Sequence, residues 1–326
     1  MNKKKINELL QEKADITARI NLIPYDGSPE MKQSGEKKYI YVRKRVGSKL
    51  TSTYVDVYSK DLFALLQKQS KELRELKKQL RHIEKELALI GYVQDNLDNK
   101  VILNLDYARA NMKQIIYDQA ILEGVSTTFP QTETIIENGT VKEMKADDIQ
   151  KILNLKHAWE FVLDKDILSY PSNLDVLSHI AKLVNEGFYD NGGRLRGVPV
   201  TIGGSTYKPE LPIEVDVKED INKIINSKKD IPAKAIELCL YCMKKQIFID
   251  GNKRASVIFA NHYLISNGAG LLVIPFDLVP EFKKLLVAYY ENRDKGKTAD
   301  FLLKKCFLKF NNNWDIIMSW YMADYE

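Results

Sequence analysis

The chain has 326 residues, of which 44% are hydrophobic and 29% charged, with a formal net charge of +5. This composition is typical of a globular protein with room for one large domain or two smaller ones. No apolar run reaches the roughly 18 residues that a membrane span requires, so no membrane association is expected. Met1 leads into lysines rather than a signal peptide, and the cysteines are odd in number, so we expect a cytoplasmic protein with reduced thiols.

The pattern of residues 1–100 predicts an N-terminal helical arm. Apolar residues recur at helical spacing over 6–20 and again over 62–89, and Gly91 ends the second helix. Between them, β-branched and aromatic runs on both sides of Gly47-Ser48 predict a β-hairpin. We therefore expect two antiparallel helices joined by a hairpin. A coiled-coil dimer is the alternative, although its heptads are irregular.

The hairpin, at residues 37–49, is strongly basic. Residues 1–100 contain 21 lysines and arginines against 14 aspartates and glutamates. The excess gathers in Lys32, Lys37, Lys38, Arg43, Lys44, Arg45 and Lys49. A basic hairpin that also carries tyrosines suits a nucleic-acid or an acidic protein partner. The other interpretation is a solvated edge whose charges deter the addition of further strands.

Shorter helices separated by loops characterise residues 101–326, which we interpret as a second domain. Segment 192–212 interrupts the helical pattern with glycine, proline and β-branched residues, and predicts a small β-hairpin or flap. Residues 252–266 are apolar nearly all round, so we expect a buried central helix capped by Asn267-Gly268. The other helical patterns cover 106–124, part of 125–139, 145–164, 176–187 and 231–245.

A CxxC pair, Cys239 and Cys242, lies within the last of these helical patterns. A zinc site needs a second pair of ligands, and no other Cys or His pair in the sequence has ligand spacing. A redox site of the thioredoxin kind needs a preceding strand. We therefore interpret both residues as buried helix cysteines.

A dense polar turn, Asp250-Gly251-Asn252-Lys253-Arg254, precedes the predicted central helix. The start of a helix presents unpaired N–H groups and a partial positive charge. Gly251 lets the backbone approach a ligand, Asn252 can bond a phosphate oxygen, and Arg254 can clamp an anion. Asp250 suits the same place if Mg²⁺ bridges it to the phosphate. The turn therefore predicts a site for a metal-bound polyphosphate, and a capped helix–helix turn is the alternative.

The stretch from Gln246 to Arg254 resembles the signature of the Fic/Doc (Fido) family, His-x-Phe-x-Asp/Glu-Gly-Asn-Gly-Arg. Leu122-Glu123-Gly124 resembles the family's inhibitory helix motif, and residues 200–212 resemble the flap that docks a target segment. The resemblance covers about 101–310. It implies a mainly α fold, a Fic-type helical bundle with a small β-hairpin flap, here preceded by the helix–hairpin–helix arm.

The resemblance also implies an activity, the transfer of AMP from ATP to a hydroxyl of a protein held at the flap. Phe248 would pack the loop into the core, and Asp250 would hold Mg²⁺. Gly251, Asn252 and Lys253 would form the anion hole, and Arg254 would bind phosphate. Glu123 and Gly124 would occupy the regulatory positions.

Two departures concern the chemistry. Gln246 occupies the place of the family histidine, and an amide has no useful basicity near pH 7. His262 is no obvious replacement, because it lies ten residues after Asn252 on one helix, about 15 Å along the axis. Lys253 replaces a common glycine, which is a feature of the Doc branch, whose reaction transfers a phosphate.

Two further departures concern regulation. Val257 occupies the place of a second arginine with which the inhibitory Glu123 would pair, and Gln119 replaces the usual Ser or Thr before it. Three hypotheses follow: a nucleotide-binding protein with reduced or absent AMP transfer, a Doc-like phosphotransferase, and a non-catalytic binding module.

Overall fold

The computed structural model describes residues 2–46, 49–92, 97–139, 141, 143–294 and 296–309. The chain divides into two compact units: unit 1 comprises residues 1–94 and 137–139, and unit 2 comprises residues 95–136 and 140–326. The turn expected at Gly47-Ser48 lies outside the described residues. Among the helices that are described, none has both the length and the apolar character needed to cross a bilayer.

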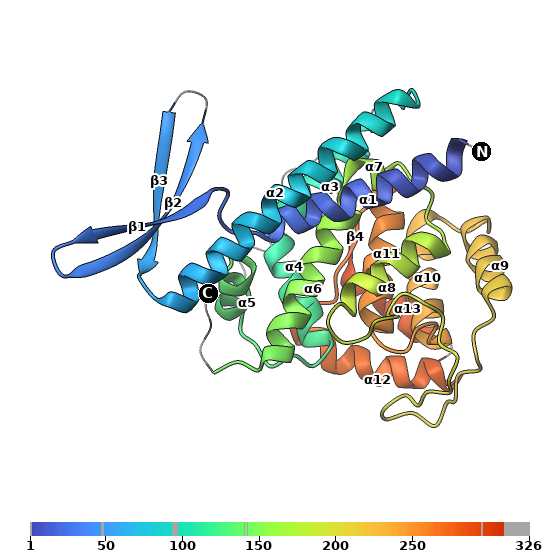
Figure 1. Cartoon of the computed structure of the whole chain (residues 1–326). Helices are drawn as coiled ribbons and strands as arrows, with labels where there is room; N and C mark the ends of the chain where they lie inside the picture. The colour runs from blue at the N-terminus through green and yellow to red at the C-terminus, as the bar shows by residue number, and fades with distance from the viewer. Residues whose placement is uncertain are drawn as a thin grey trace. The chain divides into compact units, whose positions relative to one another are not determined.

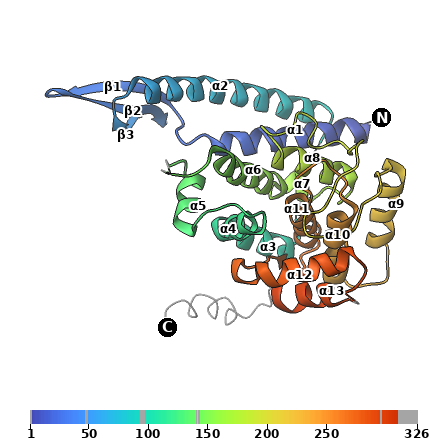
Figure 2. The same cartoon turned by 90° about the horizontal axis from the view of Figure 1, so that it is seen from below.

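Unit 1 contains a pair of antiparallel helices, α1 (Asn2–Leu22) and α2 (Lys60–Leu89), as the sequence predicts (Figures 1 and 2). The hydroxyl of Ser59 accepts a hydrogen bond from the N–H of Leu62 and so caps the start of α2. The two helices bury apolar residues that recur at helical spacing, and these form one core. That core consists of Leu9, Leu10, Ile16, Leu76, Ile83 and Leu87.

The remainder of unit 1 is an antiparallel sheet in the order β1 (Ser28–Ser34), β2 (Lys37–Val46), β3 (Lys49–Val57). The predicted hairpin corresponds to β2 and β3. Strand β1 was not predicted, because its sequence, SPEMKQS, lacks an alternating apolar pattern. Ile40 and Val42 are buried on one face of β2, and a register shift between Ile40 and Tyr41 bends its pairing with β3.

Unit 2 is a helical bundle around α11 (Asn252–Ser266), which contacts α3, α6, α8 and α10 (Figure 1). This arrangement confirms the predicted mainly α fold. The other elements of the unit are α3 (Asn99–Ala110), α4 (Met112–Leu122), α5 (Phe129–Ile136), α6 (Ala146–Val162), α7 (Lys165–Leu168), α8 (Leu174–Val184), α9 (Glu214–Ile225), α10 (Ile231–Lys245), β4 (Leu271–Leu272), η1 (Phe276–Leu278), α12 (Val279–Tyr290), α13 (Lys297–Phe301), η2 (Leu302–Cys306) and β5 (Phe307–Leu308).

The central helix behaves as its sequence predicts. Every residue of α11 from Arg254 to Ile265 is buried. The helix ends at Asn267, and Gly268 follows in the left-handed region with φ +60°. Its N–H bonds the carbonyl of Ile265 at 2.9 Å, which closes the helix end. An all-round apolar helix can therefore serve as the core around which the rest of unit 2 packs.

Two helix predictions need correction. The single helix expected over 106–124 is divided at Asn111 into α3 and α4, because the Asn111 side chain bonds the carbonyl of Tyr107 at 2.9 Å and competes with the helical pattern. Helix α9 was not predicted. Its buried Val217, Ile221 and Ile224 have helical spacing, so the signal was present in the sequence.

The expectation of a β-hairpin in segment 192–212 is wrong, because the segment forms no strand and runs as a loop between α8 and α9 (Figure 1). Its carbonyl groups are bonded by a side chain instead of a neighbouring strand. The buried guanidinium of Arg196 donates to the carbonyls of Val198 at 2.8 Å, Pro209 at 3.2 Å and Glu210 at 2.6 Å. Prolines within the segment also lack the N–H that a ladder requires.

A carboxylate from the end of α12 holds the tip of this loop. Glu291 accepts hydrogen bonds from the N–H of Thr206 at 2.8 Å, the Thr206 hydroxyl at 3.0 Å and the Ser205 hydroxyl at 3.1 Å, and it also pairs with Arg293. These bonds lower the pKa of Glu291 to about 2. The hydrogen bond from the Thr206 N–H contributes most to this lowering, and the bond from Arg293 contributes next. The loop is thus anchored at both its base and its tip.

The three cysteines are buried free thiols, which confirms the predicted burial of Cys239 and Cys242. Burial raises the pKa of Cys239 and Cys242, and it raises that of Cys306 to about 12. Within the part of the chain that the structure describes, no group of three His, Cys, Asp or Glu side chains is arranged to hold a metal ion.

Candidate functional site

The polar turn between α10 and α11 begins at Gln246, the residue that the sequence resemblance predicts to take the place of the family histidine. Gln246 ends α10 in the left-handed region, with φ 48° and ψ 60°. Its side-chain amide donates to the carbonyl of Met243 at 2.6 Å and accepts from the Asn252 amide at 3.2 Å. Both ends of the side chain are therefore engaged in the turn itself, and neither is a base.

Asn252 fixes the shape of the turn from the first position of α11. Its oxygen accepts from the N–H of Phe248 at 2.9 Å, and its nitrogen donates to the carbonyl of Phe248 at 2.8 Å. Phe248 is itself buried in the core. The amide of Asn252 thus holds the loop backbone in place, and its predicted contact with phosphate stays a prediction.

Gly251 is required by the close approach of α8 to the turn. It adopts φ +72°, a region that L side chains rarely enter. A Cβ at this position would lie 2.8 Å from Oδ1 of Asn185 and 2.9 Å from a methyl group of Val184. The buried Asn185, at the end of α8, in turn donates to the carbonyl of Asp250 at 2.9 Å and so supports the turn.

Arg254 is the buried cation of the site. It donates to the carbonyl of Val184 at 2.6 Å and to Oδ2 of Asp250 at 3.0 Å. Glu123, which ends α4, places its carboxylate 3.7 Å from Nε of Arg254 and 3.7 Å from Nζ of Lys253. The residues of the predicted phosphate site therefore lie together with the predicted regulatory carboxylate.

Asp250 is the residue best placed to hold a divalent cation. Its side chain is 49% exposed, and only Oδ2 is bonded to Arg254. Mg²⁺ is commonly bound through one or two carboxylates together with substrate phosphates and waters. A single exposed carboxylate next to a helix start fits that pattern, whereas an all-protein metal cage would need more ligands.

Comparison with known proteins supports the resemblance. Residues 171–264, which include the whole turn, match the model of the Fic/DOC family. Residues 171–264 are a Fic/DOC domain. Residues 3–64 match a separate domain of unknown function, DUF6788. A search of curated proteins finds no match.

The fold is also similar to that of solved structures. Fic-1 (residues 134–508) from C. elegans superposes with a TM-score of 0.51 at 17% identity, over 75% of this chain and 74% of that chain. A Fic family protein from Desulfovibrio desulfuricans gives a TM-score of 0.49 at 16% identity, over 65% and 73% of the two chains. A Fic domain containing signaling protein from Bacteroides thetaiotaomicron gives 0.47 at 15% identity, over 59% and 76%. At this identity, the likeness to Fic-1 shows the fold.

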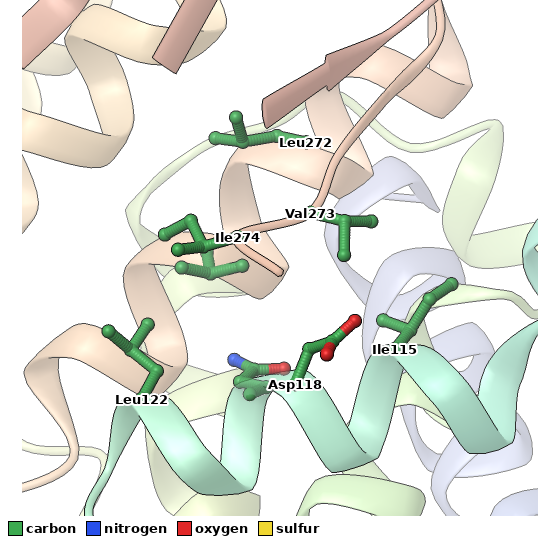
Figure 3. A pocket seen from close by; sticks show the side chains of 8 residues that line it. Ile115, Asp118, Leu122, Leu272, Val273 and Ile274 are labelled. Atoms are coloured by element: carbon green, nitrogen blue, oxygen red, sulfur yellow. The ribbon is translucent and has the colours of Figure 1, made fainter. Parts of the chain in front are cut away.

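Val257 of the Fic/DOC domain, which the sequence resemblance predicts to take the place of a second arginine, lines a small apolar cavity between α4 and the β4 strand (Figure 3). Leu122 and Ile274 also line it, and the carboxylate of Asp118 points into it. Its volume of about 10 Å³ is enough for one water molecule at most. The cavity cannot accept a nucleotide, and Glu123 pairs with Arg254 and Lys253 in the absence of that arginine.

Gln119 links α4 to the Fic/DOC core. Its side chain donates to the carbonyl of Arg254 at 2.9 Å and accepts from the indole N–H of Trp159 at 2.9 Å. All three residues are buried. Gln119, predicted to take the place of a Ser or Thr, therefore joins α4 to α6 and α11, and so it positions Glu123 one helical turn later.

His262 is unavailable as a base. It lies buried on α11, where Nδ1 bonds the hydroxyl of Ser172 at 2.8 Å and Nε2 donates to the carbonyl of Ile167 at 2.8 Å. Burial lowers its pKa to about 4. Both ring nitrogens are occupied, so this histidine serves packing.

Two supporting residues were missed in the sequence. Arg196 donates from Nε to the carbonyl of Gln246 at 2.5 Å, and its own N–H bonds the carbonyl of Ile247 at 3.0 Å. Asn185 supports Asp250 and Gly251 from the end of α8. Neither residue belongs to a motif, and each acts across 50 residues or more of chain, so no local pattern could have revealed it.

Proposed function

We propose that the Fic/DOC domain binds ATP with Mg²⁺ at the turn between α10 and α11, and that its AMP transfer to protein hydroxyls is weak or absent. Family membership supports the general relation to AMP transfer. The proposal of reduced activity rests on the hydrogen bonds and the chemistry of the Gln246 side chain. Its amide is bonded to Met243 and Asn252 within the turn and offers no group that can take a proton.

The phosphate would bind where positive groups gather at the start of α11. The start of α11 supplies backbone N–H groups, and Lys253 and Arg254 supply cations in its first turn. Asp250 would hold Mg²⁺ next to the phosphates. Bound there, the Mg²⁺ ion would neutralise phosphate charge. Gly251 keeps the backbone free of a side chain at this point.

Glu123 would compete with the phosphate for the same cations. Its carboxylate is 12% exposed and lies 3.7 Å from the guanidinium of Arg254, whose side chain is 2% exposed. A phosphate that used Arg254 would have to displace this contact. We therefore assign Glu123 an inhibitory role that acts through Arg254 and Lys253.

A substitution tests whether the missing base explains the low activity. We expect Gln246→His to raise transfer to protein by about 10²–10⁴-fold. Histidine tolerates the left-handed region better than most residues, so it should keep the backbone of the turn. Gln246→Asn is the matched control, because asparagine also tolerates that region but provides no base. If the histidine variant binds ATP yet transfers no more than the asparagine variant, the proposal for Gln246 fails.

The label on the protein separates two reactions. The assay uses ATP labelled on the α- or the γ-phosphate, with Mg²⁺ and a cell lysate as the source of targets. Retention of the α-label indicates AMP transfer. Retention of the γ-label alone indicates the Doc-like phosphotransfer that Lys253 favours.

A further inference from the structure

The sheet of unit 1 carries an aromatic and basic surface that the proposed nucleotide site does not use. Side chains of a strand alternate between the two faces of a sheet, and the register pairs Tyr41 of β2 with Glu30 of β1 and Tyr54 of β3. Residues in phase with Tyr41 share its face, which we call the tyrosine face. It carries Lys32, Lys37, Tyr39, Tyr41, Arg43, Arg45 and Tyr54.

The tyrosine face is the solvated face of the sheet. The opposite face carries Ile40 and Val42, which are buried. On the tyrosine face, Tyr54 is 50% exposed, and Arg43 and Arg45 are also exposed. The sheet thus buries its apolar side chains on one face only. The tyrosine rings on the other face do not contribute to the core.

The three tyrosines form one continuous patch. The ring of Tyr54 lies 6.2 Å from that of Tyr39 and 5.6 Å from that of Tyr41, centre to centre. The ring planes are inclined by 57° and 72°, so the rings do not stack face to face on each other. The ammonium of Lys32 lies 4.5 Å from the centre of the Tyr41 ring. Aromatic faces and cations therefore alternate across neighbouring strands.

The charge of this face remains positive after its internal pairs are formed. Four lysines and arginines, Lys32, Lys37, Arg43 and Arg45, lie on this face in phase with Tyr41, against the single acidic Glu30. Glu30 is held by Lys32 at 2.9 Å and lies 3.8 Å from Arg43. Lys37 and Arg45 make no ion pair with any described residue. Cations thus lie at both ends of the tyrosine patch.

We propose that the tyrosine face binds single-stranded nucleic acid. Exposed rings next to Arg and Lys are the combination that proteins use for single strands, because bases stack on the rings and the cations follow the phosphates. An acidic peptide would satisfy the cations but would leave the exposed ring of Tyr54 and the half-buried rings of Tyr39 and Tyr41 without a function. A double helix keeps its base faces stacked and so cannot use them.

The test measures binding of single-stranded oligonucleotides of about 12 residues to the full-length protein by fluorescence anisotropy. DNA and RNA strands form separate arms, and excess ATP is present throughout so that the nucleotide site does not contribute. We expect binding that weakens as salt rises. Two double variants change the same charge: Lys37→Gln with Arg45→Gln on the tyrosine face, and Lys38→Gln with Lys49→Gln on the opposite face.

The tyrosine-face variant should lower the slope of log affinity against log salt by about 1.4, which corresponds to two lost phosphate contacts on a single strand. The opposite-face variant should leave the slope unchanged. Tyr54→Leu should weaken binding about 5- to 100-fold, whereas Tyr54→Phe, which keeps the ring, should bind like the parent. Thermal melts confirm that each variant is folded.

Three results would overturn the proposal: no binding at low salt, equal loss in the two charge variants, or equal affinity of Tyr54→Leu and the parent. Displacement of the strand by an acidic peptide at matched charge would show that the face recognises charge alone. Tighter binding of a duplex of the same sequence would likewise contradict stacking. Binding of the DNA or the RNA arm supports the proposal and identifies the preferred strand.

Discussion

The carboxylate of Glu123 is the group whose removal should change nucleotide binding most. It lies 3.7 Å from both Arg254 and Lys253, and it makes no hydrogen bond to Arg254 Nε among the described residues, so the interaction is electrostatic. Glu123→Gln keeps the shape of the side chain and removes its charge. We expect this variant to bind Mg²⁺–ATP more tightly than the parent protein.

The magnitude follows from the distance and the burial. Two unit charges about 4 Å apart attract by about 4 kcal/mol at an effective dielectric constant of about 20. The contact with Lys253 adds little, because that side chain is 32% exposed and screened by solvent. Desolvation of Glu123 and Arg254 offsets part of the attraction, which leaves about 2 kcal/mol for a phosphate to overcome. The dissociation constant should therefore fall about thirtyfold in Glu123→Gln.

Calorimetry with Mg²⁺–ATP measures that change, and thermal unfolding provides a second readout. Without ligand, the variant should be less stable, because the buried Arg254 loses one of its two acidic neighbours. With ATP, its melting temperature should rise more than that of the parent. Glu214→Gln, which removes an exposed partner of Lys218 on α9, is the control and should change neither quantity. A folded Glu123→Gln variant with unchanged or weaker ATP affinity would refute the inhibitory role.

Three further predictions concern the architecture around the site. Gly251→Ala should lower the free energy of unfolding by about 2–4 kcal/mol in urea titrations, because alanine is strained at this φ and its Cβ clashes with α8 and Asn185. Gly203→Ala is the control and should be near neutral, because the space around Gly203 is open. Burial raises the pKa of Asp118 from 3.8 to about 6, so the folded state binds its proton more tightly and stability should fall by about 3 kcal/mol as pH rises through that window. Asp118→Asn should remove that dependence in urea titrations below and above the window, and an unchanged pH slope would contradict it. Because the pKa of Glu291 is lowered to about 2, its hold on the 192–212 loop should be complete above pH 4.5 and lost as pH falls toward 2. Glu291→Gln should accordingly make that loop more susceptible to limited proteolysis at neutral pH, and an unchanged cleavage rate would argue against the clamp.

The sequence by itself determined the features that depend on neighbouring residues. The apolar pattern of 252–266 predicted a buried helix. Gly268 predicted its end, because a glycine adopts the left-handed conformation of a helix terminus without help from distant residues. The polar turn before it was visible for the same reason, since helix starts and turns follow from residues within a few positions. The absence of a base at Gln246 needed only the identity of the residue. The binding roles assigned to the turn stay predictions.

Only the tertiary structure decided which groups support that turn and which compete with it. Arg196 reaches Gln246 across 50 residues of chain, and Asn185 reaches Asp250 across 65. The conformation of segment 192–212 was also decided by the tertiary structure. Its composition predicted a β-hairpin, but its carbonyls accept hydrogen bonds from the Arg196 guanidinium and not from a neighbouring strand. Such contacts arise because buried polar groups must be paired by whatever side chain the packing brings near, and packing is set by the whole fold and not by local pattern.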